Sequence, residues 1–118
     1  MKYKAFIIES DLYKDTVHEW QRGWGNGYVA IPPESGLHGL DYSDSKFYDI
    51  EVNGDLTYSG KASEWKKDVL KENDIPSDYW IVGFDTAHSW DTLDRWPKES
   101  VQFEADNLLK QIEVLAND

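Results

Sequence analysis

A run of six residues, Tyr79 to Phe84, is apolar on both faces of an extended chain and most constrains the fold. A strand of that kind is buried on both sides, so it needs neighbouring strands and a covering layer. Apolar side chains that recur at helical spacing near the C-terminus supply such a layer: Val101, Ala105, Leu108, Leu109, Ile112 and Leu115. We therefore expect an α+β fold, a small and mainly antiparallel sheet packed by a C-terminal helix.

Shorter patterns predict the remaining elements of a single domain over residues 1–118. Alternating, β-branched and aromatic residues predict strands at 3–8, 28–31, 47–52 and 56–58. Asn53-Gly54 predicts a type I′ hairpin between the last two strands, because both turn positions need a positive φ. A short helix is expected over 63–71, and another after Ser10 or Asp11 that carries Leu12, Tyr13, Val17 and Trp20. Pro97 suits the first turn of the C-terminal helix.

The charge and cysteine content narrow the classes of partner. The net charge is −11, from 23 acidic and 12 basic residues, which argues against direct contact with nucleic acid or an anionic membrane and permits a basic protein partner. The chain has no cysteine, which excludes disulfides and thiolate chemistry and suits a reducing cytoplasm. The apolar run Ala5 to Ile8 is too short for a signal peptide, and no segment is long enough to span a bilayer. We expect a cytoplasmic protein.

Three titratable side chains follow the central strand at intervals of three residues: Asp85, His88 and Asp91. A loop attached to a rigid strand often holds ligands. This set can bind a metal, move a proton or hydrogen-bond a turn, and the sequence alone leaves these alternatives open.

Three segments together resemble a family of small bacteriophage and prophage proteins of no firmly known activity. They are 36–42, with His38-Gly39-Leu40-Asp41-Tyr42; 53–59, with Leu56-Thr57-Tyr58-Ser59; and 80–91, with Gly83-Phe84-Asp85-Thr86-Ala87-His88. The match covers about residues 27–91. Asn53 stands where the pattern often has histidine, and Gly54-Asp55 stands where a double glycine is usual. The resemblance implies a phage or prophage origin and a setting in the bacterial cytoplasm.

The first functional hypothesis is an accessory protein that binds rather than catalyses, an anti-defence protein that sequesters a small, nucleotide-like ligand. Aromatic walls with a few fixed polar groups are typical of such a site, and a base can stack on Trp90 or Tyr42. The candidate ligand-binding residues are His38, Asp41, Tyr42, Tyr58, Asp85, His88, Trp90 and Asp91. No cofactor or metal ligand is assigned. Six Trp and seven Tyr also suit a homo-oligomer interface.

Two alternatives stay open. The first is an acidic protein that inhibits a host defence nuclease by occupying its nucleic-acid-binding surface. Five carboxylates within fifteen residues favour it: Asp41, Asp44, Asp49, Glu51 and Asp55. The second is a small metal-dependent hydrolase that uses His38 or His88, although no known nucleophile or zinc motif occurs in the chain. A structural role, in which each histidine pins its loop through an aspartate, competes with both.

Overall fold

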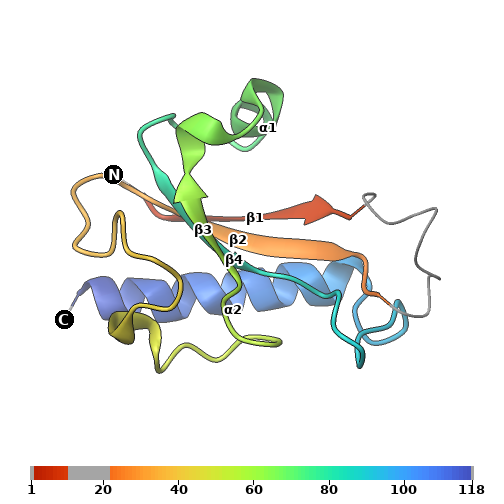
Figure 1. The fold of residues 1–118 in the computed structure, drawn as a ribbon. Helices are drawn as coiled ribbons and strands as arrows, with labels where there is room; N and C mark the ends of the chain where they lie inside the picture. The colour runs from red at the N-terminus through yellow and green to blue at the C-terminus, as the bar shows by residue number, and fades with distance from the viewer. Residues whose placement is uncertain (1, 11–21, 118) are drawn as a thin grey trace.

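A computed structural model describes residues 2–10 and 22–117. In these two ranges, four strands and two α-helices follow one another, with two short 3-10 helices between them (Figure 1). The elements are β1 (Lys4–Glu9), β2 (Gly25–Ile31), η2 (Ser45–Phe47), β3 (Tyr58–Lys61), η3 (Ala62–Glu64), α1 (Lys67–Glu72), β4 (Trp80–Phe84) and α2 (Lys98–Ala116). The helix expected after Ser10 or Asp11 lies outside the described residues.

The strands form one sheet in the order β1-β2-β4-β3, and every neighbouring pair is antiparallel. The predicted central strand occupies an internal position as β4, where Ile81 and Val82 have no exposed surface. A strand between two others forms hydrogen bonds on both edges and packs on both faces, which explains why its sequence is apolar throughout. The expected α+β class with an antiparallel sheet is confirmed.

The C-terminal helix α2 covers one face of the sheet (Figure 1). Its buried residues are Val101, Ala105, Leu108 and Ile112, which belong to the predicted stripe. They pack against Val29, Ile31, Val82 and Phe84 of the sheet. Pro97 occupies the N-cap position, immediately before the first residue of the helix. Its fixed φ is compatible with the start of a helix. The prediction of this helix is confirmed.

The predicted strand 47–52 and its hairpin are wrong. Phe47 ends η2, and an irregular segment follows it. The side chains of Phe47, Ile50, Val52 and Leu56 are buried in the same core cluster as residues of α2 and the sheet. Side chains of α2 supply hydrogen bonds that a partner strand would otherwise make: Gln111 bonds both the N–H and the C=O of Glu51, at 2.8 and 2.9 Å. The alternation in sequence reflects core contacts of a loop, because apolar spacing alone does not report backbone pairing.

The turn at Asn53-Gly54 exists but has another geometry. The N–H of Asp55 donates to the C=O of Val52 at 3.0 Å, and positive φ falls on Gly54 (69°) and Asp55 (64°) instead of on Asn53 and Gly54. Such a turn does not return the chain onto itself as a type I′ turn does. The next strand, β3, therefore begins at Tyr58, later than predicted, and pairs with β4.

The opposite face of the sheet carries a second apolar cluster, beside α1. The predicted 63–71 helix is divided into η3 and α1, with Leu70 buried as expected. Tyr28 stacks on Phe6 at 5.3 Å between ring centroids and meets Trp65 edge to face at 4.9 Å. Burial in this cluster raises the pKa of the Tyr28 phenol, since the charged form loses its hydration.

Within the described residues, no helix has both the length and the apolar character needed to cross a membrane.

Candidate functional site

The loop that follows β4 is fastened to the start of β2. The hydroxyl of buried Thr86 donates to the C=O of Gly25 at 2.6 Å, and the N–H of Gly23 donates to the C=O of Thr86 at 2.7 Å. A loop tied to two neighbouring strands keeps its side chains in fixed positions. The residues predicted from 85 to 91 therefore extend from a rigid base.

Asp91 lies at the centre of this loop and has no exposed surface. Its Oδ1 accepts a hydrogen bond from Asn53 Nδ2 at 2.9 Å. Its Oδ2 accepts from the backbone N–H of His88 at 2.9 Å and lies 2.8 Å from His88 Nδ1. Because a carboxylate only accepts, Nδ1 is the ring nitrogen that donates to Asp91.

The ring of His88 is held by two further neighbours. It stacks on Trp90 with ring centroids 4.6 Å apart and planes 8° from parallel. It also lies against Gly54, where a Cβ atom would come within 2.2 Å of His88 Cε1 and 2.3 Å of Nε2. Only glycine permits this approach, so the Asn-Gly turn and the histidine form one packed unit.

Asp85, His88 and Asp91 place ligand atoms within 4.8 Å of one another, close enough to suggest a metal centre. Every carboxylate oxygen, however, already accepts a hydrogen bond. Asp85 Oδ2 accepts from the Thr57 hydroxyl at 2.9 Å, and Asp85 Oδ1 accepts from the N–H of Ala87 at 3.0 Å. Nδ1 of His88 is engaged by Asp91. The geometry describes a hydrogen-bonded clamp that closes the loop.

Asn53 completes the clamp, and sequence reasoning did not assign it. Besides donating to Asp91, its side chain accepts from Trp90 Nε1 at 3.1 Å, and its backbone N–H donates to Glu104 Oε2 at 3.0 Å. It therefore joins the turn, the loop after β4 and α2. The signal in sequence is the amide side chain of Asn53, which can both donate and accept, at the first position of an Asn-Gly turn.

His38 lies away from the clamp. Its Nε2 donates to the C=O of Asp78 at 2.8 Å, and its ring is 6.0 Å from that of Trp80. These partners precede or begin β4, whereas Asp85 follows the end of that strand. The structure therefore does not bring His38 and His88 together.

Asp41 and Tyr42 lie beside the middle of β3. The N–H of Tyr42 donates to Ser59 Oγ at 3.0 Å. The Asp41 carboxylate accepts from the hydroxyl and backbone N–H of Ser43 and from Ser59, and these hydrogen bonds, that of the Ser43 hydroxyl first, hold the pKa of Asp41 below its usual value. Asp41 therefore closes its own loop.

Tyr58 is directed to the other face of the sheet. Its hydroxyl accepts from Trp65 Nε1 at 2.8 Å, and its ring meets that of Tyr28 edge to face at 5.8 Å. Both tyrosines are paired with Gly83 across the sheet, from β3 and from β2. Tyr58 thus packs in the second cluster, apart from the loops with which the sequence grouped it.

Exposed aromatic side chains gather around the Asn53-Gly54 turn. Of the five exposed large apolar residues in the described chain, Tyr42, Tyr48 and Trp90 share a cleft or a hydrogen bond with the turn segment, and Phe103 precedes Glu104, the residue that accepts the N–H of Asn53. Tyr42 and Tyr48 line a cleft with Asp55 and Leu56, Trp90 donates to Asn53, and Phe103 shares a groove with Glu104, the acceptor for the N–H of Asn53. We call these four residues, with the exposed carboxylates of Asp49, Glu51 and Asp55, the turn surface.

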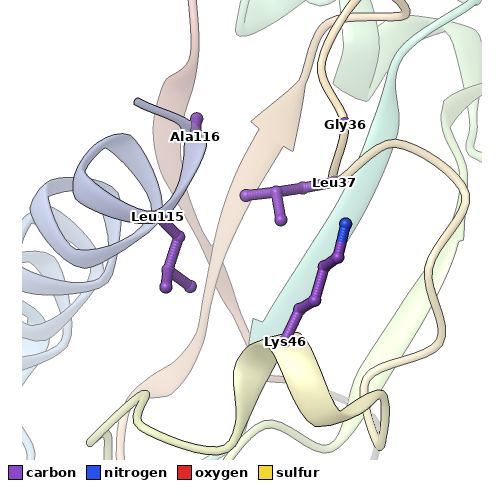
Figure 2. Close-up of a pocket in the computed structure, with 5 residues that line it drawn as sticks. All are labelled: Gly36, Leu37, Lys46, Leu115 and Ala116. Atoms are coloured by element: carbon purple, nitrogen blue, oxygen red, sulfur yellow. The ribbon is translucent and has the colours of Figure 1, made fainter. Parts of the chain in front are cut away.

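A separate cavity of about 310 Å³ lies at the C-terminal end of α2 (Figure 2). It is lined by Gly36, Leu37, Lys46, Leu115 and Ala116, none of which the sequence assigned to a site. Figure 2 shows the Lys46 side chain extending beside Leu37, across from Leu115.

The packing of Gly54 against His88 leads to a quantitative prediction. Gly54→Ala introduces both a strained positive φ and a collision with the ring, and we expect a loss of about 2 kcal/mol in the free energy of unfolding. Gly39 also has a positive φ (87°), but nothing lies within 4 Å of its Cβ position, so Gly39→Ala should cost about 1 kcal/mol.

Urea denaturation of a double-mutant cycle measures the collision separately. In a His88→Ala background the ring is absent, and Gly54→Ala should then cost no more than Gly39→Ala. An unchanged cost in that background would show that the ring does not rest on Gly54.

Comparison of the chain with family models, with curated proteins and with solved structures finds no match.

Proposed function

We propose that this protein binds a basic surface of another protein through the turn surface. The observation that carries the proposal is the clustering of four exposed aromatic rings with exposed carboxylates around one turn. Aromatic residues are enriched in protein interfaces, where they provide large contact areas at low entropic cost. Carboxylates add attraction for a cationic partner and raise the rate of association.

The charges of the described residues support a cationic partner. Apart from the two contacts of His88, no described Lys, Arg or His lies within ion-pair distance of a carboxylate. Among the residues that the structure describes, no cation therefore pairs with the acidic groups of the turn surface, and the chain as a whole carries a net charge of −11. A basic partner would relieve this repulsion, whereas a phosphate-bearing ligand would increase it.

The resemblance to phage and prophage proteins gives this proposal a biological form. A host defence nuclease holds its nucleic acid in a basic groove, and an acidic surface with projecting aromatic rings suits that groove. In this form the protein is an anti-defence inhibitor that competes with nucleic acid. The clamp of Asp85, His88, Asp91 and Asn53 then serves to hold Trp90 in place for the partner.

A nucleotide-like ligand is the second candidate, and one groove favours it. The groove, of about 450 Å³, is lined by Arg95, Trp96, Glu99, Ser100, Phe103 and Glu104. Arg95 can bind a phosphate and the aromatic rings can stack on a base. The two glutamates repel phosphate in the same groove, so a protein partner ranks first. A rise in melting temperature with ADP or a cyclic dinucleotide, abolished by Arg95→Ala, would reverse this order.

Matched charge variants test the proposal against labelled twelve-residue peptides that are arginine-rich, lysine-rich, neutral or acidic. Asp49→Asn/Glu51→Gln/Asp55→Asn neutralises the turn surface, and Glu64→Gln/Glu72→Gln/Asp74→Asn neutralises three exposed acids near α1. Each variant raises the net charge by three. By fluorescence anisotropy at low salt, we expect the first to weaken binding of basic peptides about tenfold and the second less than threefold.

Equal losses in the two variants would show that basic peptides respond only to net charge. Equal binding of the neutral or acidic peptides would contradict a cationic partner. Either result would overturn the proposal.

A further inference from the structure

The cleft within the turn surface combines an apolar floor with aromatic sides. It measures about 390 Å³ and is lined by Tyr42, Ser43, Phe47, Tyr48, Asp55 and Leu56. Phe47 and Leu56 are buried, so they form an apolar floor, whereas Tyr42 and Tyr48 are exposed at its sides. Ligand pockets span roughly 300–1,000 Å³, and this cleft lies near the lower limit.

One charged group in the cleft is free to bind. Among the described residues, none donates a hydrogen bond to the carboxylate of Asp55 or pairs with it as a cation. The carboxylate of Asp41, only one residue from Tyr42, is by contrast engaged by Ser43 and Ser59. Asp55 is therefore the acceptor that remains available beside the two tyrosines.

We infer that this cleft binds the guanidinium group of an arginine from the basic partner, an inference that rests on the proposed function. A guanidinium is planar, stacks on aromatic rings and donates paired hydrogen bonds to a carboxylate. The cleft provides each complement: the rings of Tyr42 and Tyr48, the carboxylate of Asp55, and an apolar floor for the methylene stem. Lysine lacks the planar group and is more strongly hydrated, so it binds less well.

The test uses three blocked amino acids as probes, Nα-acetyl-N-methylamides of arginine, citrulline and lysine. Citrulline has nearly the shape of arginine without its charge. Each is titrated into the ¹⁵N-labelled protein and followed by amide chemical shifts. We expect arginine to produce saturable shifts at Tyr42, Tyr48 and Asp55, lysine to bind about threefold more weakly, and citrulline to give no saturation.

Two aspartates provide a matched pair of variants. Asp55 and Asp74 are the non-glycine residues of the described chain with positive φ, 64° and 55°. Asparagine tolerates that conformation, so Asp55→Asn and Asp74→Asn change the charge without straining the backbone. Asp55→Asn should lower the affinity for the arginine probe about fivefold, and Asp74→Asn should leave this affinity unchanged. Tyr48→Ala should lower the affinity for the arginine probe by a similar factor, and Tyr48→Phe should retain the affinity because the aromatic ring remains.

The possible outcomes distinguish the arginine pocket from the proposed function, which is binding of a basic protein by the turn surface. If basic peptides bind the turn surface but the probe shifts lie elsewhere, or if Asp55→Asn and Asp74→Asn behave alike, the arginine pocket is wrong and the function stands. Tighter binding of lysine, or saturation by citrulline, would also overturn the pocket. If the peptides fail to bind as well, the proposed function falls with it.

Discussion

Asp91→Ala should lower the free energy of unfolding by about 3 kcal/mol, which corresponds to a fall of about 12 °C in melting temperature. Asp91 has no exposed surface, and both of its oxygens accept hydrogen bonds. Alanine would leave the backbone N–H of His88 without its acceptor, and the amide of Asn53 would keep only its longer hydrogen bond to the C=O of Asp85, at 3.4 Å. The unpaired donors, and the cavity that remains, set the size of the effect.

Two further variants make the Asp91 prediction specific. Asp91→Asn keeps one acceptor and should lose about half as much stability, since its amide group faces the donors of His88. Asp94→Ala removes an exposed carboxylate nearby and should change the stability by less than about 0.5 kcal/mol. Thermal denaturation followed by circular dichroism measures all three. An Asp91→Ala protein that melts within 3 °C of the parent would contradict the clamp.

Gly83→Ala should destabilise the protein as much as Asp91→Ala does, with a loss of about 3 kcal/mol in the free energy of unfolding. A Cβ at this position in β4 would lie 2.2 Å from Cδ1 of Tyr28 and 2.6 Å from the backbone oxygen of Gly27. The oxygen belongs to the neighbouring strand and cannot rotate away. Removing the ring by Tyr28→Ala should therefore recover only part of the cost of the substitution, as a double-mutant cycle in urea would show.

Gly36→Ala is the matched control for Gly83→Ala. Nothing lies within 4 Å of the Cβ position of Gly36, and its φ is not in the left-handed region, so the change should stay within about 0.5 kcal/mol. If the two alanine variants unfold at similar denaturant concentrations, the close packing of Tyr28 over Gly83 is not a feature of the folded protein in solution.

The sequence identified the elements whose burial pattern follows from their own periodicity. The stripe of α2 and the apolar run of β4 specify a helix face and a two-sided strand, and these patterns place each element against a core. Such features depend on residues adjacent along the chain.

The segment 47–56 shows where this reasoning ends. Its apolar residues are buried, but its backbone forms hydrogen bonds with Gln111 and Glu104 of α2, about fifty to sixty residues later in the chain. The local pattern of apolar and polar residues does not indicate a hydrogen-bond partner so far away in the sequence. The same limit applies to Asn53, whose role depends on Asp91, Trp90 and Glu104 arriving at one point.

The predicted site residues were likewise divided by the fold. The sequence selected Asp85, His88 and Asp91 as a set because their spacing places them in one loop, and the structure brings them together. His38 and Tyr58 were grouped with them although they come from separate segments of the sequence, and they lie at the other end of β4 and on the other face of the sheet.

The sequence by itself determined the fold class, the acidic character and the loop that holds the clamp, because periodicity, charge and short spacings are local properties. Only the tertiary structure decided which side chains are free. It engaged the carboxylates of Asp85 and Asp91 in hydrogen bonds and left Asp55 beside exposed tyrosines, because the availability of a polar group depends on donors supplied by distant segments.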